Sequence, residues 1–182
     1  MEIDKRYDLR EKRSLADYKF LFVSRGVNDV AKAIQYAYIQ TIDEIDIYNL
    51  GFGDYNADTQ TISDDANTNN GDAYKVFNTV LATIPIFFEK FISSTILVRG
   101  SDSTAEFLKN CGLSCRKRCE SECKKFNQRI RIYRNYIDKN YLTLAKEYRF
   151  YGGYVDENNQ ILIEDYSPLK TYDAILLSKV NS

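Results

Sequence analysis

Apolar and polar residues alternate in the first third of the chain, and this pattern predicts β-strands. Residues 18–24 (YKFLFVS) are rich in aromatic and β-branched side chains, as expected for a strand. Residues 30–40 place Val30, Lys32 and Ile34 at every second position, which favours a second strand paired with the first. The alanines of that stretch leave a helix open. The pattern predicts further strands at 45–52, 59–62, 93–99, 154–155, 161–163 and 174–180.

Apolar residues three and four positions apart predict the helices. Asp72 is expected to cap the first helix, and Pro85 is expected to kink or restart it. A second helix should begin near residue 103 and end at Gly112, because glycine is typical of a helix C-terminus. Ser114 is then expected to cap a new helical piece. The last helix, about 127–146, has Ile130, Tyr133, Ile137, Tyr141 and Leu144 on one face.

These elements predict an α+β fold: a single domain over residues 1–182, with a mostly antiparallel sheet and helices packed on one side. A chain of 182 residues is long enough for one hydrophobic core. Residues 1–17 form a charged lead-in that is either helical or loose. No internal repeat and no linker divides the sequence.

Charge is unevenly distributed along the chain, although the net charge is only −1. No Lys or Arg occurs between Lys32 and Lys75, whereas eight basic residues lie between Arg116 and Arg134. The chain has no histidine. This absence excludes Ser-His-Asp and Cys-His catalysis and any histidine metal ligand.

The sequence has neither a recognisable signal peptide nor a membrane span. The N-terminal segment is charged, and the longest apolar stretch, 76–98, is interrupted by Asn78, Pro85, Glu89 and Lys90. We therefore expect a cytoplasmic protein that does not contact a membrane. A reducing compartment disfavours a framework of disulfides.

All four cysteines fall within thirteen residues and are spaced four apart. On a straight helix their sulfurs would form a stripe about 18 Å long, so at most two neighbours could share a zinc ion. A four-cysteine zinc site requires bends at Gly112 and near Ser121, or a second chain. Structural thiols are favoured, and metal ligands or disulfides remain alternatives. The residues concerned are Cys111, Cys115, Cys119 and Cys123.

Two segments are candidates for binding an anion. The loop 100–104 follows an apolar strand and precedes a helix, a place where backbone amides and a helix dipole suit a phosphate. The alternative is that a side chain of the loop only caps the helix. Arginines of the last helix, with tyrosines interleaved, are typical of a nucleic-acid backbone contact, but also of a solvated helix face. The candidates are Gly100, Ser101, Ser103, Thr104, Arg129, Arg131 and Arg134.

A third group of residues could hold a metal for catalysis. Asp54, Asp72 and Lys75, with Asp64 and Asp65, could form a magnesium site, because phosphodiester cleavage needs carboxylates and often a lysine that orients water. The alternative is ordinary turn and cap chemistry, since Asn-Gly-Asp is typical of turns.

Several short motifs lie along the chain: Phe52-Gly53-Asp54, Asn70-Gly71-Asp72 with Lys75 and Val76, Val98-Arg99-Gly100-Ser101 and Arg129-Ile130-Arg131-Ile132-Tyr133. Together they resemble a family of small bacterial proteins, domain of unknown function 6934. The resemblance covers about 18–179 and carries no activity that can be transferred. It implies that residues 105–128, with all four cysteines, are an inserted helical knob. It also implies that Ser101 and Thr104 lie near Arg129 and Arg131.

The leading hypothesis is a bacterial protein that binds a phosphate-bearing partner, with nucleic acid expected, through the loop 100–104 and the basic helix. A toxin–antitoxin or mobile-element setting would suit such a protein, although no residue points to it. One alternative is a metal-dependent phosphodiesterase that uses Asp54, Asp72 and Lys75. The other is a non-enzymatic module that binds a protein partner or dimerises through the cysteine segment, with or without zinc.

Overall fold

The computed structural model describes residues 5–14, 17–63, 70–100, 102, 105–114, 119, 123–155 and 161–180. The chain forms two compact units, Met1–Ser94 and Thr95–Ser182, which we describe in turn. Each unit combines antiparallel strand ladders with helices. The predicted α+β class with mostly antiparallel strands is therefore confirmed.

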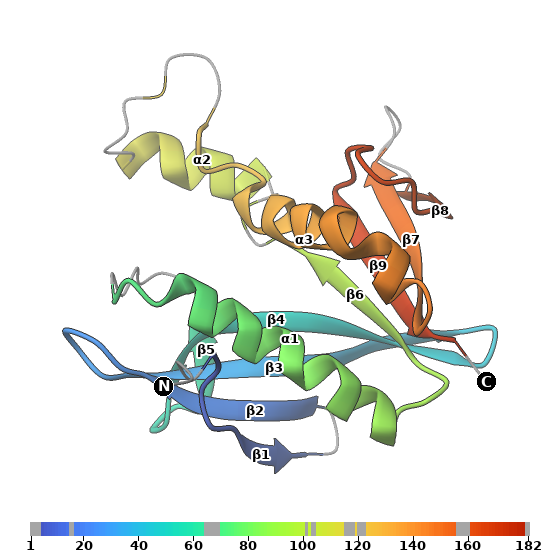
Figure 1. The fold of residues 1–182 in the computed structure, drawn as a ribbon. Helices are drawn as coiled ribbons and strands as arrows, with labels where there is room; N and C mark the ends of the chain where they lie inside the picture. Colours follow the sequence, from blue (N-terminus) through green and yellow to red (C-terminus); the bar gives the residue numbers. More distant parts are fainter. Residues whose placement is uncertain are drawn as a thin grey trace. The chain divides into compact units, whose positions relative to one another are not determined.

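The first unit is built on a long antiparallel ladder. Strand order is β1-β2-β3-β4, and the short β5 pairs with the end of β4 (Figure 1). Strands β3 and β4 are joined by a tight turn at Asp43 and Glu44, which both adopt positive φ. The strands are β1 (Arg10–Arg13), β2 (Asp17–Ser24), β3 (Val30–Ile42), β4 (Ile45–Asn56) and β5 (Thr61–Ser63).

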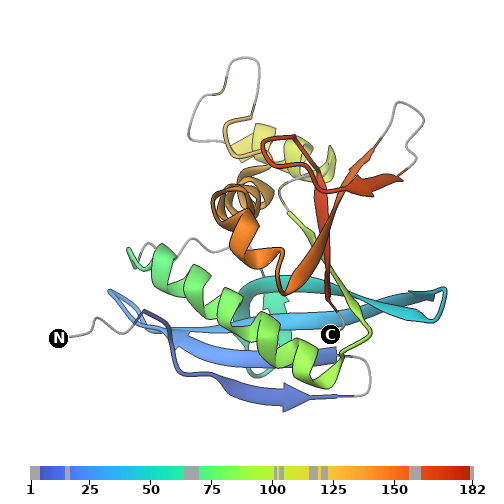
Figure 2. The same cartoon turned by 45° about the vertical axis from the view of Figure 1, so that its right-hand side comes forward.

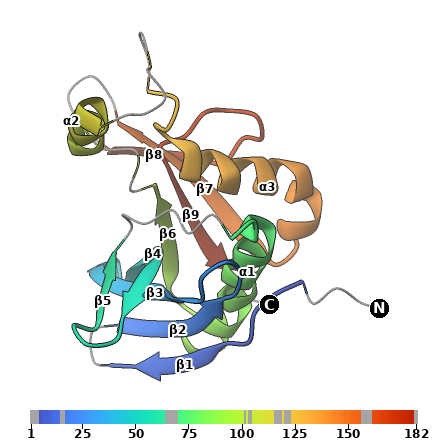
Figure 3. The same cartoon turned by 90° about the vertical axis from the view of Figure 1, so that its left-hand side faces the viewer.

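Helix α1 (Ala73–Lys90) lies across one face of these strands (Figures 1 and 3). The side chains on this face include Phe20 and Tyr36, which are fully buried. The ring of Phe87 stacks on Tyr36 with centroids 4.3 Å apart, so helix and strands share an aromatic core. Pro85 was predicted to kink or restart this helix; α1 continues through it without restarting, and the kink stays a prediction. Pro85 lies on an exposed position inside α1, where water can satisfy the carbonyl that loses its partner.

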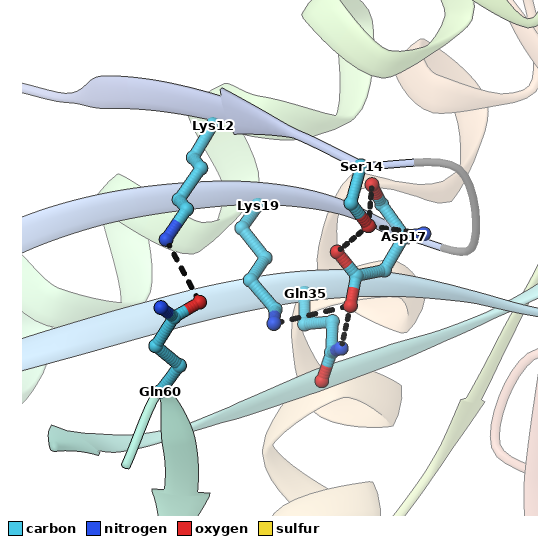
Figure 4. A network of polar contacts seen from close by, with 6 residues as sticks. All are labelled: Lys12, Ser14, Asp17, Lys19, Gln35 and Gln60. Atoms are coloured by element: carbon cyan, nitrogen blue, oxygen red, sulfur yellow. Dashed lines mark hydrogen bonds and ion pairs between the residues drawn. The ribbon is translucent and has the colours of Figure 1, made fainter. Parts of the chain in front are cut away.

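The residues that alternate with this buried set form the opposite face, which carries polar side chains beside apolar ones such as Leu21 and Ala33. Asp17 is the centre of a network on this face: it accepts hydrogen bonds from Ser14 at 2.8 Å and Gln35 at 2.7 Å and pairs with Lys19 at 3.0 Å (Figure 4). Beside it, Lys12 on β1 donates to Gln60. Strand β1 was not predicted, because its four residues are all charged and show no alternation of apolar and polar side chains.

In its described residues, the second unit has four strands in the order β6-β9-β7-β8 and two helices (Figure 2). Phe150, Tyr166 and Tyr172 form a buried aromatic cluster beside these strands. Gly112 does not end the second helix as predicted, because that helix continues to Ser114. The elements are β6 (Thr95–Arg99), α2 (Ala105–Ser114), α3 (Gln128–Leu144), β7 (Tyr148–Val155), β8 (Ile161–Asp165) and β9 (Ala174–Lys179).

Among the described helices, none combines the length and the apolar composition that crossing a membrane requires.

Candidate functional site

Asp102 joins the loop after β6 to the start of α3. Its backbone carbonyl accepts a hydrogen bond from the Asn127 amide at 3.1 Å, and its carboxylate accepts one from the Arg129 amide at 3.0 Å. Asp102 is buried, with 6% of its surface exposed. The structure therefore places the described part of the predicted loop next to Arg129. Gly100 is also buried, whereas Ser101, Ser103 and Thr104 lie outside the described residues.

The carboxylate of Asp102 acts as the N-cap of α3. Asn127 precedes the helix with a positive φ of 57° and makes no side-chain cap bond. Asp102 instead supplies an acceptor to an amide of the first turn, and its negative charge suits the positive end of the helix. Its second oxygen, Oδ1, is buried and has no hydrogen-bond partner among the described residues. The amides of this helix end therefore already face an anion, the protein's own.

Basic residues instead gather on the exposed surface of α3. The charged residues that are exposed on this helix are Arg131 and Lys139, and both are cationic. Lys124 and Lys125, just before the helix, are exposed as well. We call these four residues the basic stripe. Polar and apolar side chains share the exposed face of α3 with them: Gln128, Ile132, Asn135, Leu142 and Thr143.

The opposite side of α3 fixes the helix in its unit. Ile130 is fully buried, and Asp138 accepts a hydrogen bond of 2.7 Å from the hydroxyl of Tyr166. Burial and this bond to Asp138 raise the pKa of Tyr166, so its hydroxyl stays a proton donor. Asp138, the acidic residue of α3, is half-buried and is bonded to Tyr166. Burial also raises the pKa of Tyr133 to about 12, although the charge of Arg129 opposes this.

The predicted arginines differ in their exposure. Arg131 is exposed, whereas Arg129 and Arg134 are half-buried. The Nε atom of Arg134 is buried and has no hydrogen-bond partner among the described residues. Arg131 is therefore the predicted arginine best placed for an external ligand. Lys139 was missed, although its spacing of eight residues from Arg131 puts both on one helix face.

In the first unit, Asp54 and Asp72 belong to a cluster organised around Lys32. Lys32 forms an ion pair with Asp54 on the neighbouring strand, and its charge also acts on Asp72. The side chains of Lys32 and Asp54 are 7% and 16% exposed. Asp72 accepts hydrogen bonds from Ser24 at 2.6 Å and Tyr7 at 2.7 Å.

The ammonium group of Lys32 therefore supplies the positive charge beside Asp54 and Asp72, where the sequence predicted a magnesium ion. Lys75 lies with its Nζ atom 4.3 Å from the centroid of the Tyr7 ring. Asp64 and Asp65 lie outside the described residues. No group of three or more Asp, Glu or Cys side chains in the described part of the chain is arranged to hold a metal ion. The geometry favours a structural ion-pair cluster.

The lowered pKa of Asp72 predicts how the stability of the fold changes in acid. Burial opposes its ionisation, but the bonds from Ser24 and Tyr7 and the charge of Lys32 outweigh burial and hold its pKa below the usual 3.8. A lowered pKa means that the carboxylate stabilises the fold above about pH 4 and loses this effect as the pH falls through the folded pKa. An Asp72→Asn variant should be less stable than the wild type near pH 7, and this difference should shrink below about pH 3. Urea unfolding at several pH values measures it, and a pH-independent difference would contradict the assignment.

The cysteine segment is partly described. Cys111 lies on α2 and is buried, whereas Cys119 and Cys123 are half-buried. The thiol of Cys123 lies 3.4 Å from the sulfur of Cys111, twelve residues away. These two cysteines therefore converge in space. Cys115 lies outside the described residues.

A comparison with protein families identifies the chain. The model of a family of unknown function, DUF6934, matches residues 4–114, which is more than half of the sequence. The chain therefore belongs to this family. The match includes the Phe52–Asp54 and Asn70–Asp72 motifs but ends before the Arg129–Tyr133 motif. The insertion at 105–128 stays a prediction. No curated protein and no solved structure is detectably similar to the chain.

Proposed function

We propose that the protein binds a phosphate-bearing partner, with nucleic acid as the expected one, through the basic stripe of α3. The single observation that carries the proposal is the charge of this exposed surface. Among the described residues, the exposed charged side chains on α3 and just before it are all cationic, whereas Asp102 is buried and Asp138 is half-buried and bonded to Tyr166. A phosphate chain binds most readily to such a row of cations.

The spacing of the stripe suits an extended ligand. Arg131 and Lys139 are eight residues apart, which is about 12 Å along a helix. Lys124 and Lys125 add two exposed cations just before the N-terminus of α3. Because Asp102 already faces the helix amides, the partner contacts guanidinium and ammonium groups rather than the loop. Such a contact depends on the charge of the nucleic-acid phosphate backbone and has little sequence preference.

Charge reversal on the stripe tests the proposal. An Arg131→Glu/Lys139→Glu variant should bind fluorescently labelled single-stranded DNA, RNA or duplex at least about tenfold more weakly than the wild type. The measurement is fluorescence anisotropy at fixed salt. Lys146→Glu/Lys179→Glu makes the same charge change at exposed lysines outside the stripe and should bind much more nearly as the wild type does. Equal losses in the two variants would mean that only net charge matters.

A further inference from the structure

We propose that Cys111 and Cys123 form a peroxide-sensitive pair of thiols that closes to a disulfide between α2 and the segment before α3. The two sulfur atoms are 3.4 Å apart. A disulfide bond is about 2.05 Å long, so closure needs an approach of only about 1.4 Å. Both residues are in the thiol form in this structure. The inference does not depend on the proposed nucleic-acid contact.

The two thiols differ in their exposure to solvent, as a peroxide-sensitive pair requires. Cys123 is half-buried and lies outside any helix, so a small oxidant in solvent reaches it. Cys111 is 8% exposed and lies behind it on α2, where it is protected from direct attack but in contact with Cys123. Two exposed cations, Lys124 and Lys125, follow Cys123 directly in the sequence, and Glu122 precedes it.

The remaining described cysteine is held in a different contact. The sulfur of Cys119 accepts a hydrogen bond from the Lys124 amide at 3.4 Å. A disulfide between Cys119 and Cys123, four residues apart, would have strained geometry if those residues were helical. The pair that spans twelve residues has no such restriction, because its two members come from different parts of the fold.

The chemistry is balanced with a peroxide as the oxidant. The Cys123 thiolate attacks one peroxide oxygen, the O–O bond breaks, and hydroxide leaves, so that Cys123 becomes a sulfenic acid. The sulfur of Cys111 then attacks the sulfenic sulfur, and a second hydroxide leaves as the S–S bond forms. With the two thiol protons these hydroxides become two waters. The two thiols lose two electrons in total, and the peroxide gains them. A thiol reductant reverses the reaction by exchange.

Two variants of the full chain test the assignment. Cys115→Ser/Cys119→Ser keeps only the proposed pair, and Cys111→Ser/Cys123→Ser keeps only the other two cysteines. Treatment with hydrogen peroxide should take the first variant from two titratable thiols to none. Trypsin should then release residues 110–116 joined to residues 119–124, because Arg116, Lys117 and Arg118 separate them. The second variant should lose its thiols at least about tenfold more slowly.

Other outcomes would overturn the proposal. Equal oxidation rates in the two variants would remove the special role of the pair. A disulfide between two molecules would show that Cys111 and Cys123 of one chain do not react with each other. One zinc ion per chain in the wild type as purified, with thiols that peroxide does not oxidise until the metal is chelated, would show that the cysteines are metal ligands. Peptide mapping of oxidised wild type supplies the result if a variant fails to fold.

Discussion

Replacing Lys32 with Met is expected to lower the free energy of unfolding by about 3 kcal/mol or more. Lys32 is the cation of a buried cluster, with a side chain that is 7% exposed and paired with Asp54. Its removal leaves the carboxylate of Asp54 in a largely dry site without a partner. It also takes away the positive charge that helps to keep Asp72 ionised. The loss is large because a buried charge without its partner is more costly than no ion pair at all.

A double-mutant cycle separates this effect from packing. Asp54→Leu alone should also be strongly destabilising, whereas Lys32→Met/Asp54→Leu should lose less than the sum of the two single changes, with a coupling energy above about 1 kcal/mol. Lys12→Met is the control, because Lys12 is exposed and its described polar contact is the hydrogen bond to Gln60. Urea denaturation gives all four values. If Lys32→Met had the same free energy of unfolding as Lys12→Met, the ion pair of Lys32 and Asp54 would not behave as a buried ion pair.

Gly152→Ala is expected to cost about 3 kcal/mol in the second unit, because the added carbon has no space. A Cβ at this position would lie 2.1 Å from the ring of Tyr172, well inside any real contact distance. That ring cannot move aside easily: Tyr172 is 1% exposed, and its hydroxyl donates to Glu164 at 2.8 Å and accepts from the Ser167 amide at 3.1 Å. Overpacking of a core against a fixed ring has costs of this size.

The neighbouring glycine is a matched control for this substitution. A Cβ at Gly153 would lie 3.4 Å from the Cβ of Ala174, which is an ordinary contact. Gly153→Ala should therefore unfold close to the wild-type temperature, whereas Gly152→Ala should unfold about 6 °C or more below it. Differential scanning calorimetry measures both. Similar melting temperatures for the two variants would mean that Tyr172 has room to move.

The consequence of Gly152→Ala should reach α3. Tyr172 packs against Tyr166, with ring centroids 5.1 Å apart, and Tyr166 donates the hydrogen bond to Asp138 of that helix. A displaced Tyr172 ring disturbs the side of α3 that faces its unit. We therefore expect weaker binding of a phosphate-bearing partner from this variant, although no residue of the basic stripe has changed.

Most strands followed from alternation, and the misses have physical causes. β2, β3 and β9 lie close to their predicted bounds. β7 begins at Tyr148, six residues before its prediction, because Tyr148 also fits the apolar spacing of the helix before it. Gly152 and Gly153 obscured the strand further, since glycine is typical of turns. Their role here is close packing, which no spacing rule reports.

The candidate site was only partly accessible from the sequence. Lys32 could have been found, because it shares the phase of Ile34 and Tyr36, and a lone cation on a buried strand face needs a partner. The bond from Asp102 to the Arg129 amide joins residues 27 positions apart, so it depends on tertiary structure and not on any local pattern. The same is true of Cys111 and Cys123, which an unbroken helix would have kept well apart.

The salt dependence of nucleic-acid binding tests the functional proposal most directly. If the basic stripe contacts phosphates, a plot of the logarithm of the binding constant against that of the salt concentration should be linear and falling. Arg131→Glu/Lys139→Glu should make its slope shallower by about two, one for each lost contact. A wild-type slope near zero, or a slope that the double variant leaves unchanged, would contradict the proposal.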